Sequence, residues 1–97
     1  MTYHVLVDDN FHYMDETERY ELGVFDSLDA AVAAAQALVD EYLRSAHKPN
    51  MSARVLFQSY MAFGEDPFIV APDQQRVAFS AREYAKHRCH VLCHPPI

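Results

Sequence analysis

One segment constrains the fold of this chain more than any other, because its apolar residues recur at helical spacing. The positions that carry them are Leu28, Ala31, Val32, Ala35, Leu38, Val39 and Tyr42. This is the i, i+3, i+4, i+7 pattern of an amphipathic helix, and alanine, the strongest helix former, fills much of the rest. Asp26-Ser27 offers an N-cap, and Asp29 suits the positive end of the helix dipole. The sequence therefore predicts a helix with one buried face that ends before Pro49-Asn50.

Two earlier segments alternate in polarity with the period of two that is typical of a strand. They span residues 3–8 and 19–25. We expect them to pair as a hairpin, although the connection over residues 9–18 is longer than the roughly 2–5 residues of most hairpin loops. A second hairpin is predicted later in the chain, from a short strand over residues 68–71 and a returning strand over residues 76–79.

Two further helices are predicted from their capping residues. Ser52 can cap a helix that ends at Gly64, although Val55-Leu56-Phe57 within it could also form a strand. Ser80-Ala81-Arg82-Glu83 is a capping box, in which the serine and the glutamate each satisfy a backbone amide of the other. The last helix should therefore begin there and run to about Cys93.

Together these elements predict one α+β domain over residues 1–97 with the element order ββααββα. The layer rules then give a four-stranded antiparallel sheet, made of two hairpins, with three helices on one face. The apolar members of the predicted faces should be largely buried: Val5, Val7, Leu22, Val24, Leu28, Val32, Leu38, Val39, Leu56, Phe57, Phe68, Val70, Phe79 and Leu92.

The charge of the chain is acidic and uneven. The formal net charge is −6, and residues 1–48 hold ten acids against three bases, while residues 49–97 hold four acids against five bases. The absence of a basic stripe argues against nucleic acid and against an anionic membrane surface as partners. We expect no secretory signal at Met1 to His4 and no membrane-spanning segment. With only two cysteines, which we expect to be reduced, the interpretation is a cytoplasmic protein.

A stripe of metal-binding side chains lies on the predicted last helix. At about 100° per residue, its members fall on one narrow face: Glu83, His87, His90 and His94. Imidazoles at this spacing, together with a carboxylate, can converge on a divalent transition metal. The alternative is a solvated polar face, because one helix seldom supplies a whole coordination shell. Cys89 and Cys93 lie beside the stripe and are expected to be structural.

The long first connection is a candidate binding loop, because acids alternate there with aromatic residues. Its members are Asp8, Asp9, Phe11, His12, Tyr13, Asp15 and Glu16. Such a loop could bind a cation or a basic partner, with the aromatic rings supplying contact area. The alternative is that the aromatic residues pack under the sheet while the acids stay in solvent.

Two segments carry a resemblance to known proteins. Asp8–Glu16 reads DDNFHYMDE and Phe63–Val70 reads FGEDPFIV, and with the helix starts around them they resemble small bacterial proteins of uncharacterised function. The resemblance covers nearly the whole chain and implies no activity.

The function that these patterns favour is a non-enzymatic interaction domain, acting as a homodimer or with another protein. Two glycines cannot supply a dinucleotide-binding fingerprint or a phosphate-binding loop, and no catalytic motif stands out. The six Phe and six Tyr exceed what a core this small need bury, and the acidic N-terminal half could meet the more basic last helix of a second copy. The alternative function is a small transition-metal-binding protein that uses the histidine stripe.

Overall fold

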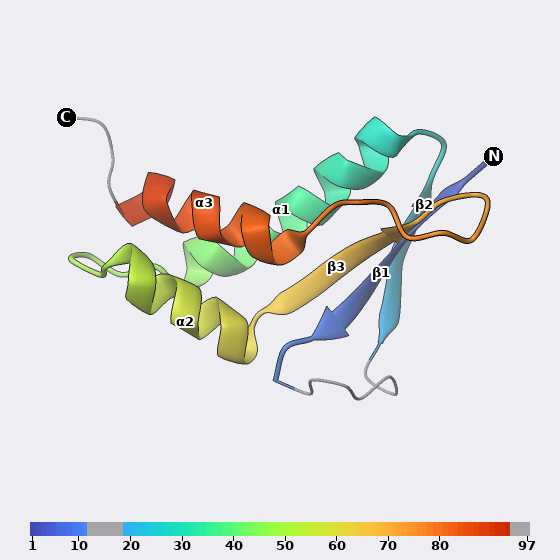
Figure 1. The fold of residues 1–97 in the computed structure, drawn as a ribbon. Coiled ribbons are helices and arrows are strands. Elements are labelled where there is room, and N and C mark those ends of the chain that lie inside the picture. The colour runs from blue at the N-terminus through green and yellow to red at the C-terminus, as the bar shows by residue number, and fades with distance from the viewer. Residues whose placement is uncertain (12–18, 94–97) are drawn as a thin grey trace.

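The computed structural model describes residues 1–11 and 19–93, which form an α+β domain with helices beside a single sheet (Figure 1). Its elements in chain order are β1 (Tyr3–Asp9), β2 (Tyr20–Phe25), α1 (Leu28–Ala46), α2 (Ala53–Phe63), β3 (Glu65–Val70) and α3 (Ala81–Cys93). The sheet is antiparallel with the strand order β2-β1-β3, so β1 is its central strand. The hairpin of the first two strands is therefore confirmed.

The prediction of four strands in two hairpins is wrong, because the described residues contain three strands. The segment over residues 76–79 meets β3 in one isolated bridge, between Val70 and Arg76. A tight turn at Gln74, whose φ is 69°, brings the chain back to the edge of β3. The amide of Phe79 then donates to the carbonyl of Val77 at 2.8 Å, a sharp turn that takes the chain away toward α3. The strand β3 pairs instead with β1.

The helices begin where the sequence predicts them, and each has a serine at its start. Ser27, Ser52 and Ser80 accept hydrogen bonds from the amides of Ala30, Val55 and Glu83, at 3.1, 3.2 and 3.2 Å. Each bond satisfies one of the amides that the first helical turn leaves without a partner. The alternative of a strand through residues 55–57 is excluded, since these residues lie in α2. In the part of the chain that the structure describes, no helix has the length and apolarity to cross a bilayer.

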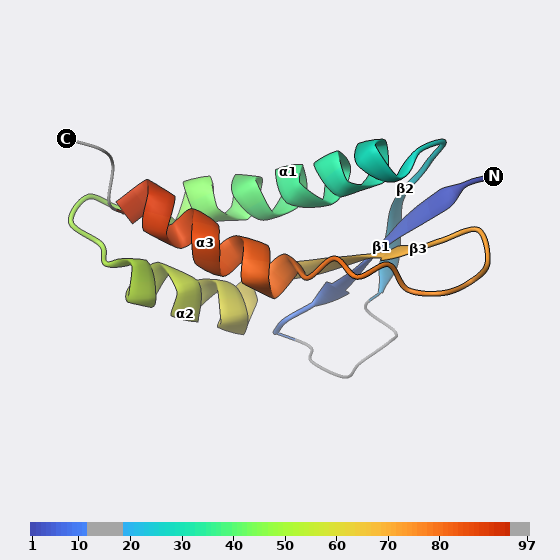
Figure 2. The same cartoon turned by 45° about the horizontal axis from the view of Figure 1, so that its top comes forward.

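The molecule is elongated, with extents of 44 × 31 × 18 Å, and its two ends are built differently. At one end α1 covers one face of the sheet, and it then continues past the strands to the other end, where α2 and α3 pack beside it (Figures 1 and 2). Buried residues along α1 recur every fourth position: Ala31, Ala35, Val39 and Leu43. The first two belong to the sheet end and the last two to the helical end.

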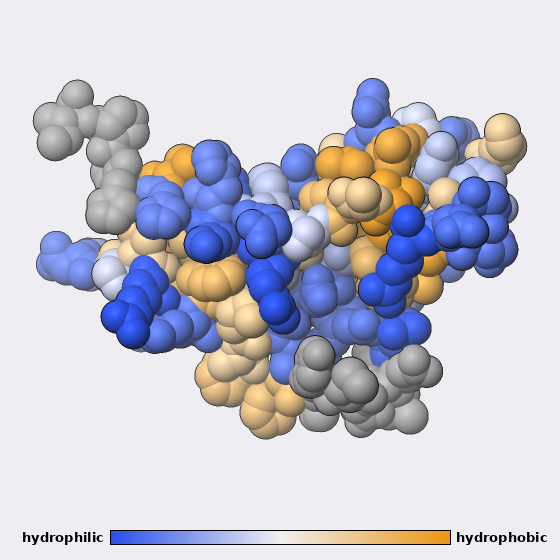
Figure 3. All heavy atoms as spheres, viewed as in Figure 1, coloured by the Kyte–Doolittle hydropathy of each residue, from blue (hydrophilic) through white to orange (hydrophobic). Residues whose placement is uncertain are grey.

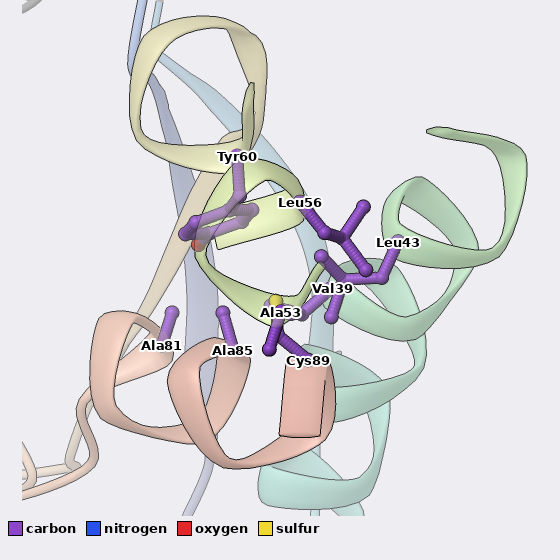
Figure 4. Packing of buried hydrophobic residues seen from close by; sticks show 8 residues of the cluster. All are labelled: Val39, Leu43, Ala53, Leu56, Tyr60, Ala81, Ala85 and Cys89. Atoms are coloured by element: carbon purple, nitrogen blue, oxygen red, sulfur yellow. The ribbon is translucent and has the colours of Figure 1, made fainter. Parts of the chain in front are cut away.

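The helical core lies where the three helices meet (Figure 4). Its buried residues are Val39, Leu43, Ala53, Leu56, Tyr60, Ala81, Ala85 and Cys89. Leu43 and Leu56 are fully buried, and the small side chains of α3 let that helix approach α2 closely. Burial and the neighbouring Cys93 raise the pKa of the Cys89 thiol to about 11, so Cys89 acts as a small apolar residue, as expected from the sequence.

The sheet core is smaller and lies between α1 and the covered face of the sheet. Its buried residues are Val5, Ala31, Ala35 and Ile69. Of the predicted core residues, Val5, Val7, Val39, Leu56 and Phe68 are buried as expected. Leu22, Val24 and Leu28 are 38%, 46% and 38% exposed, so their assignment to the core is wrong.

Tyr60 joins the two ends of the molecule. It is 1% exposed, and its hydroxyl donates to the carbonyl of Glu65 at 2.7 Å. Its own carbonyl accepts from the side chain of Asn10 at 2.9 Å and from the amide of Gly64 at 2.8 Å. The amide of Asn10 donates to the carbonyl of Gly64, so the end of β1 is tied to the end of α2.

A second polar link joins α1 to α3 through Asp40. Its carboxylate accepts from the Tyr84 hydroxyl at 2.8 Å and from Nε of Arg88 at 3.0 Å. The charge of Arg88 is therefore balanced by an acid of α1.

Candidate functional site

The predicted metal stripe lies on the exposed side of α3. Glu83, His87 and His90 are all exposed, and His94 falls outside the described residues. Within residues 1–11 and 19–93, no group of three His, Cys, Asp or Glu side chains comes together in a way that could hold a metal ion. The stripe as a whole, with His94, stays a prediction.

The predicted binding loop is only partly described. Asp8 and Asp9 belong to β1, and Phe11 follows it, whereas His12, Tyr13, Asp15 and Glu16 fall outside the described residues. Phe11 does not pack under the sheet. It is 62% exposed and stacks on Phe63, with the ring centroids 5.6 Å apart. Phe63 lies at the end of α2, and Figure 3 shows apolar side chains at the surface there.

A third region, which we call the open sheet face, is the side of the sheet turned away from α1. In an antiparallel sheet directly paired residues share a face, and Val5 and Ile69 are paired and buried against α1. Alternation along the strands, together with the register shift that pairs Leu6 with Glu21, places the following residues on the other side: His4, Leu6 and Asp8 of β1; Glu21, Leu22 and Val24 of β2; Asp66, Phe68 and Val70 of β3.

The β2 side of the open sheet face is its exposed apolar part. Leu22 and Val24 lie there at 38% and 46% exposure. The register between β1 and β2 shifts between Val5 and Leu6, a bulge of the kind common at sheet edges. Gly23 faces α1, and the Phe25 ring lies beside it. A Cβ added at Gly23 would stand 3.1 Å from that ring, so the ring occupies much of the space that a side chain would need.

The β3 side of the open sheet face is covered by arginines. Phe68 is 8% exposed, and the guanidinium carbons of Arg76 and Arg19 stand 3.8 and 4.9 Å from its ring centroid. Cations over an aromatic face are attracted by the ring quadrupole. Phe68 is thus shielded from solvent by the chain itself, whereas Leu22 and Val24 are not.

The charges on the open sheet face nearly cancel, in contrast to the rest of the chain. Nε of Arg19 donates to Asp8 at 2.6 Å, and the ring of His4 bonds Glu21 at 3.0 Å. Burial and the neighbouring Asp8 raise the pKa of the Asp66 carboxyl, against the opposing effect of two arginines. The face therefore presents apolar and paired polar groups without a strong field of one sign.

Strand β2 forms one edge of the sheet, and no other described strand pairs with its outer side. Such an edge presents backbone donors and acceptors to any strand that approaches it. Sequence reasoning found the alternation of Leu22 and Val24 but assigned it to the core. The signal that could have corrected it is Gly23, because a glycine inside a strand often marks a place where another group approaches the backbone closely.

No protein-family model matches the sequence, and no curated protein and no solved structure matched it either.

Proposed function

We propose that this chain is a non-enzymatic interaction domain that forms a homodimer by pairing β2 with β2 of a second copy. The observation that carries the proposal is the edge strand itself: Leu22 and Val24 are 38% and 46% exposed beside a backbone edge with which no other described strand pairs. Addition of a strand to a sheet edge is a general mode of association, in which main-chain hydrogen bonds give affinity and alternate side chains give specificity.

A second copy is the partner that the edge fits best. The same strand from two copies can pair in antiparallel orientation about a two-fold axis, so that each contact occurs twice. A register with Gly23 opposite Gly23 brings Leu22 of each copy beside Val24 of the other, on a continuous open face. The near-cancellation of charge on that face lets two chains of net charge −6 approach there without strong repulsion.

The expected dimer is weak, because a six-residue strand buries less than a stable interface needs. Standard interfaces bury about 1,600 Å² in total. Leu28, 38% exposed at the start of α1 directly after β2, can enlarge the contact. We place this dimer in the cytoplasm, since the cysteines Cys89 and Cys93 are both free.

The test is sedimentation velocity on untagged protein from about 1 µM to about 500 µM, a range that brackets a micromolar dissociation constant. The wild-type mass should rise from 11.1 kDa toward twice that value. Val24→Lys should hold the protein at the monomer mass, because a lysine on an edge strand opposes strand addition.

The matched control is Val91→Lys on α3, a valine with 40% exposure far from β2. It should dimerise like the wild type, with circular dichroism reporting that both variants fold. A wild type that stays monomeric throughout the range, or equal behaviour of the two variants, contradicts the proposal.

A further inference from the structure

A small hollow lies between the start of α2 and the middle of α3. Its volume is about 200 Å³, and it is lined by Ala53, Arg54, Phe57, Lys86 and His90. Lys86 and His90 are one helical turn apart and so share a face of α3. Three of the five lining residues are basic, and Phe57 and Ala53 give the hollow an apolar wall. Figure 3 shows hydrophilic side chains over α3 and over this end of α2.

The basic character of this hollow is unusual in a chain with 14 acids and 8 lysines and arginines. Elsewhere Arg19 pairs with Asp8 and Arg88 pairs with Asp40. Within the described residues neither Arg54 nor Lys86 makes an ion pair, and no carboxylate lines the hollow. Two positive charges therefore face one small space to which the described residues bring no counter-charge.

We propose that this hollow binds a small organic phosphate monoester with a single ring or a short apolar group. Arg54 would hold the phosphate with its planar fork of donors, and Lys86 would add a compact positive charge. A phosphate monoester carries close to two negative charges near neutral pH, which matches the two cations. A cavity of roughly 150 Å³ accommodates a benzene ring, so the hollow suits one ring beside Phe57 and Ala53.

This site is independent of the proposed dimer. Strand β2 lies at the sheet end of the molecule, and the hollow lies between α2 and α3 at the helical end (Figure 2). Loss of one would therefore leave the other in place.

The experiment is an amide NMR titration of the full chain with phenyl phosphate. Residues 53–57 and 86–90 should shift in a saturable manner. Inorganic phosphate should shift the same residues with lower affinity, because it lacks the ring, and phenol should not shift them, because it lacks the charge. A titration with no saturable shift at these residues overturns the proposal.

Three variants distinguish specific binding in the hollow from non-specific attraction to the positive charge of α3. Arg54→Gln and Lys86→Gln should each weaken phenyl phosphate binding by about tenfold, the loss of one charge-assisted contact. Arg82→Gln removes an exposed arginine of α3 outside the hollow and should leave binding unchanged. All three residues are exposed, so the variants should fold like the wild type. Equal weakening by Arg82→Gln and Lys86→Gln would show attraction to the general charge of α3 and would overturn the site.

Discussion

The helical end and the sheet end of this molecule differ in how completely each buries its apolar residues. In the helical core, α1, α2 and α3 surround Leu56 and Tyr60, which are at most 1% exposed. At the sheet end α1 covers one face of the sheet, and Leu22 and Val24 on the other face remain at the surface. The helical end therefore buries its apolar residues within one chain, whereas the sheet end leaves at the surface the residues that the proposed dimer would cover.

The largest effect should come from truncating the helical core. Leu56→Ala should lower the free energy of unfolding by about 2–5 kcal/mol, because a fully buried leucine leaves a cavity. Val24→Ala at the sheet end should cost less than about 0.5 kcal/mol in dilute monomer, since its side chain is exposed. Urea unfolding of both variants gives the comparison, and equal losses would mean that the two ends do not differ in this way.

The two glycines give a second test of the same difference. A Cβ at Gly64 would stand 2.5 Å from a ring carbon of Tyr60 and 2.8 Å from its carbonyl oxygen, so Gly64→Ala should cost about 1–3 kcal/mol. A Cβ at Gly23 meets the end of the Phe25 ring at 3.1 Å, a longer contact than those at Gly64 and one with a side chain rather than with backbone. Thermal unfolding should therefore show a larger loss for Gly64→Ala, and the reverse order would contradict this account of the tightly packed end.

A smaller effect on the free energy of unfolding is expected from Tyr84, whose hydroxyl links α3 to Asp40 of α1. Burial, then its hydrogen bond to Asp40, raises the pKa of the Tyr84 hydroxyl to about 12. The unfolded chain loses this proton near pH 10, before the folded chain does. The free energy of unfolding should consequently be unaffected by this group below about pH 10 and should fall as the pH rises toward 12.

Tyr84→Phe should cost about 1 kcal/mol at neutral pH, for one hydrogen bond, and should reduce the alkaline loss. Urea unfolding of the variant and the wild type at a series of pH values measures both effects. An unchanged alkaline slope would assign the loss to other groups.

The sequence predicted the helices well because their signals are local. The capping serines Ser27, Ser52 and Ser80 all act as expected. The face of α1 was predicted less well, since Leu28 is exposed and the helix instead buries every fourth residue, starting at Ala31. Small alanines allow the sheet to approach that line closely, which periodicity alone does not reveal.

The sheet was harder to predict because its pairing is between distant segments. Pro67 was treated as the boundary of a strand, yet it lies inside β3 opposite Val7. A proline is tolerated there because β3 is at an edge of the strand order. The sequence predicted a hairpin between residues 68–71 and 76–79, whereas the strand that pairs with β3 is β1, far earlier in the chain.

The candidate site could be predicted only in part. Asp8 was predicted to belong to a binding loop, and it does lie on the open sheet face. Its carboxylate accepts a hydrogen bond from Arg19. Leu22 and Val24 were recognised as one face of a strand, yet α1 covers the opposite face, where Phe25 packs against the sheet core. That choice is set by packing across the sheet and cannot be taken from the spacing of the residues.

Pairing of β2 with a second copy is tested most directly by amide hydrogen exchange of β2 at a low and a high protein concentration. If β2 pairs with a second copy, those amides of Tyr20–Phe25 that point away from β1 should exchange more slowly at the high concentration. The amides of α2, which lies outside the proposed contact, should exchange at the same rate at both. Rates in β2 that do not change with concentration, in a range where the protein stays folded, would contradict the claim that this edge is completed by a partner.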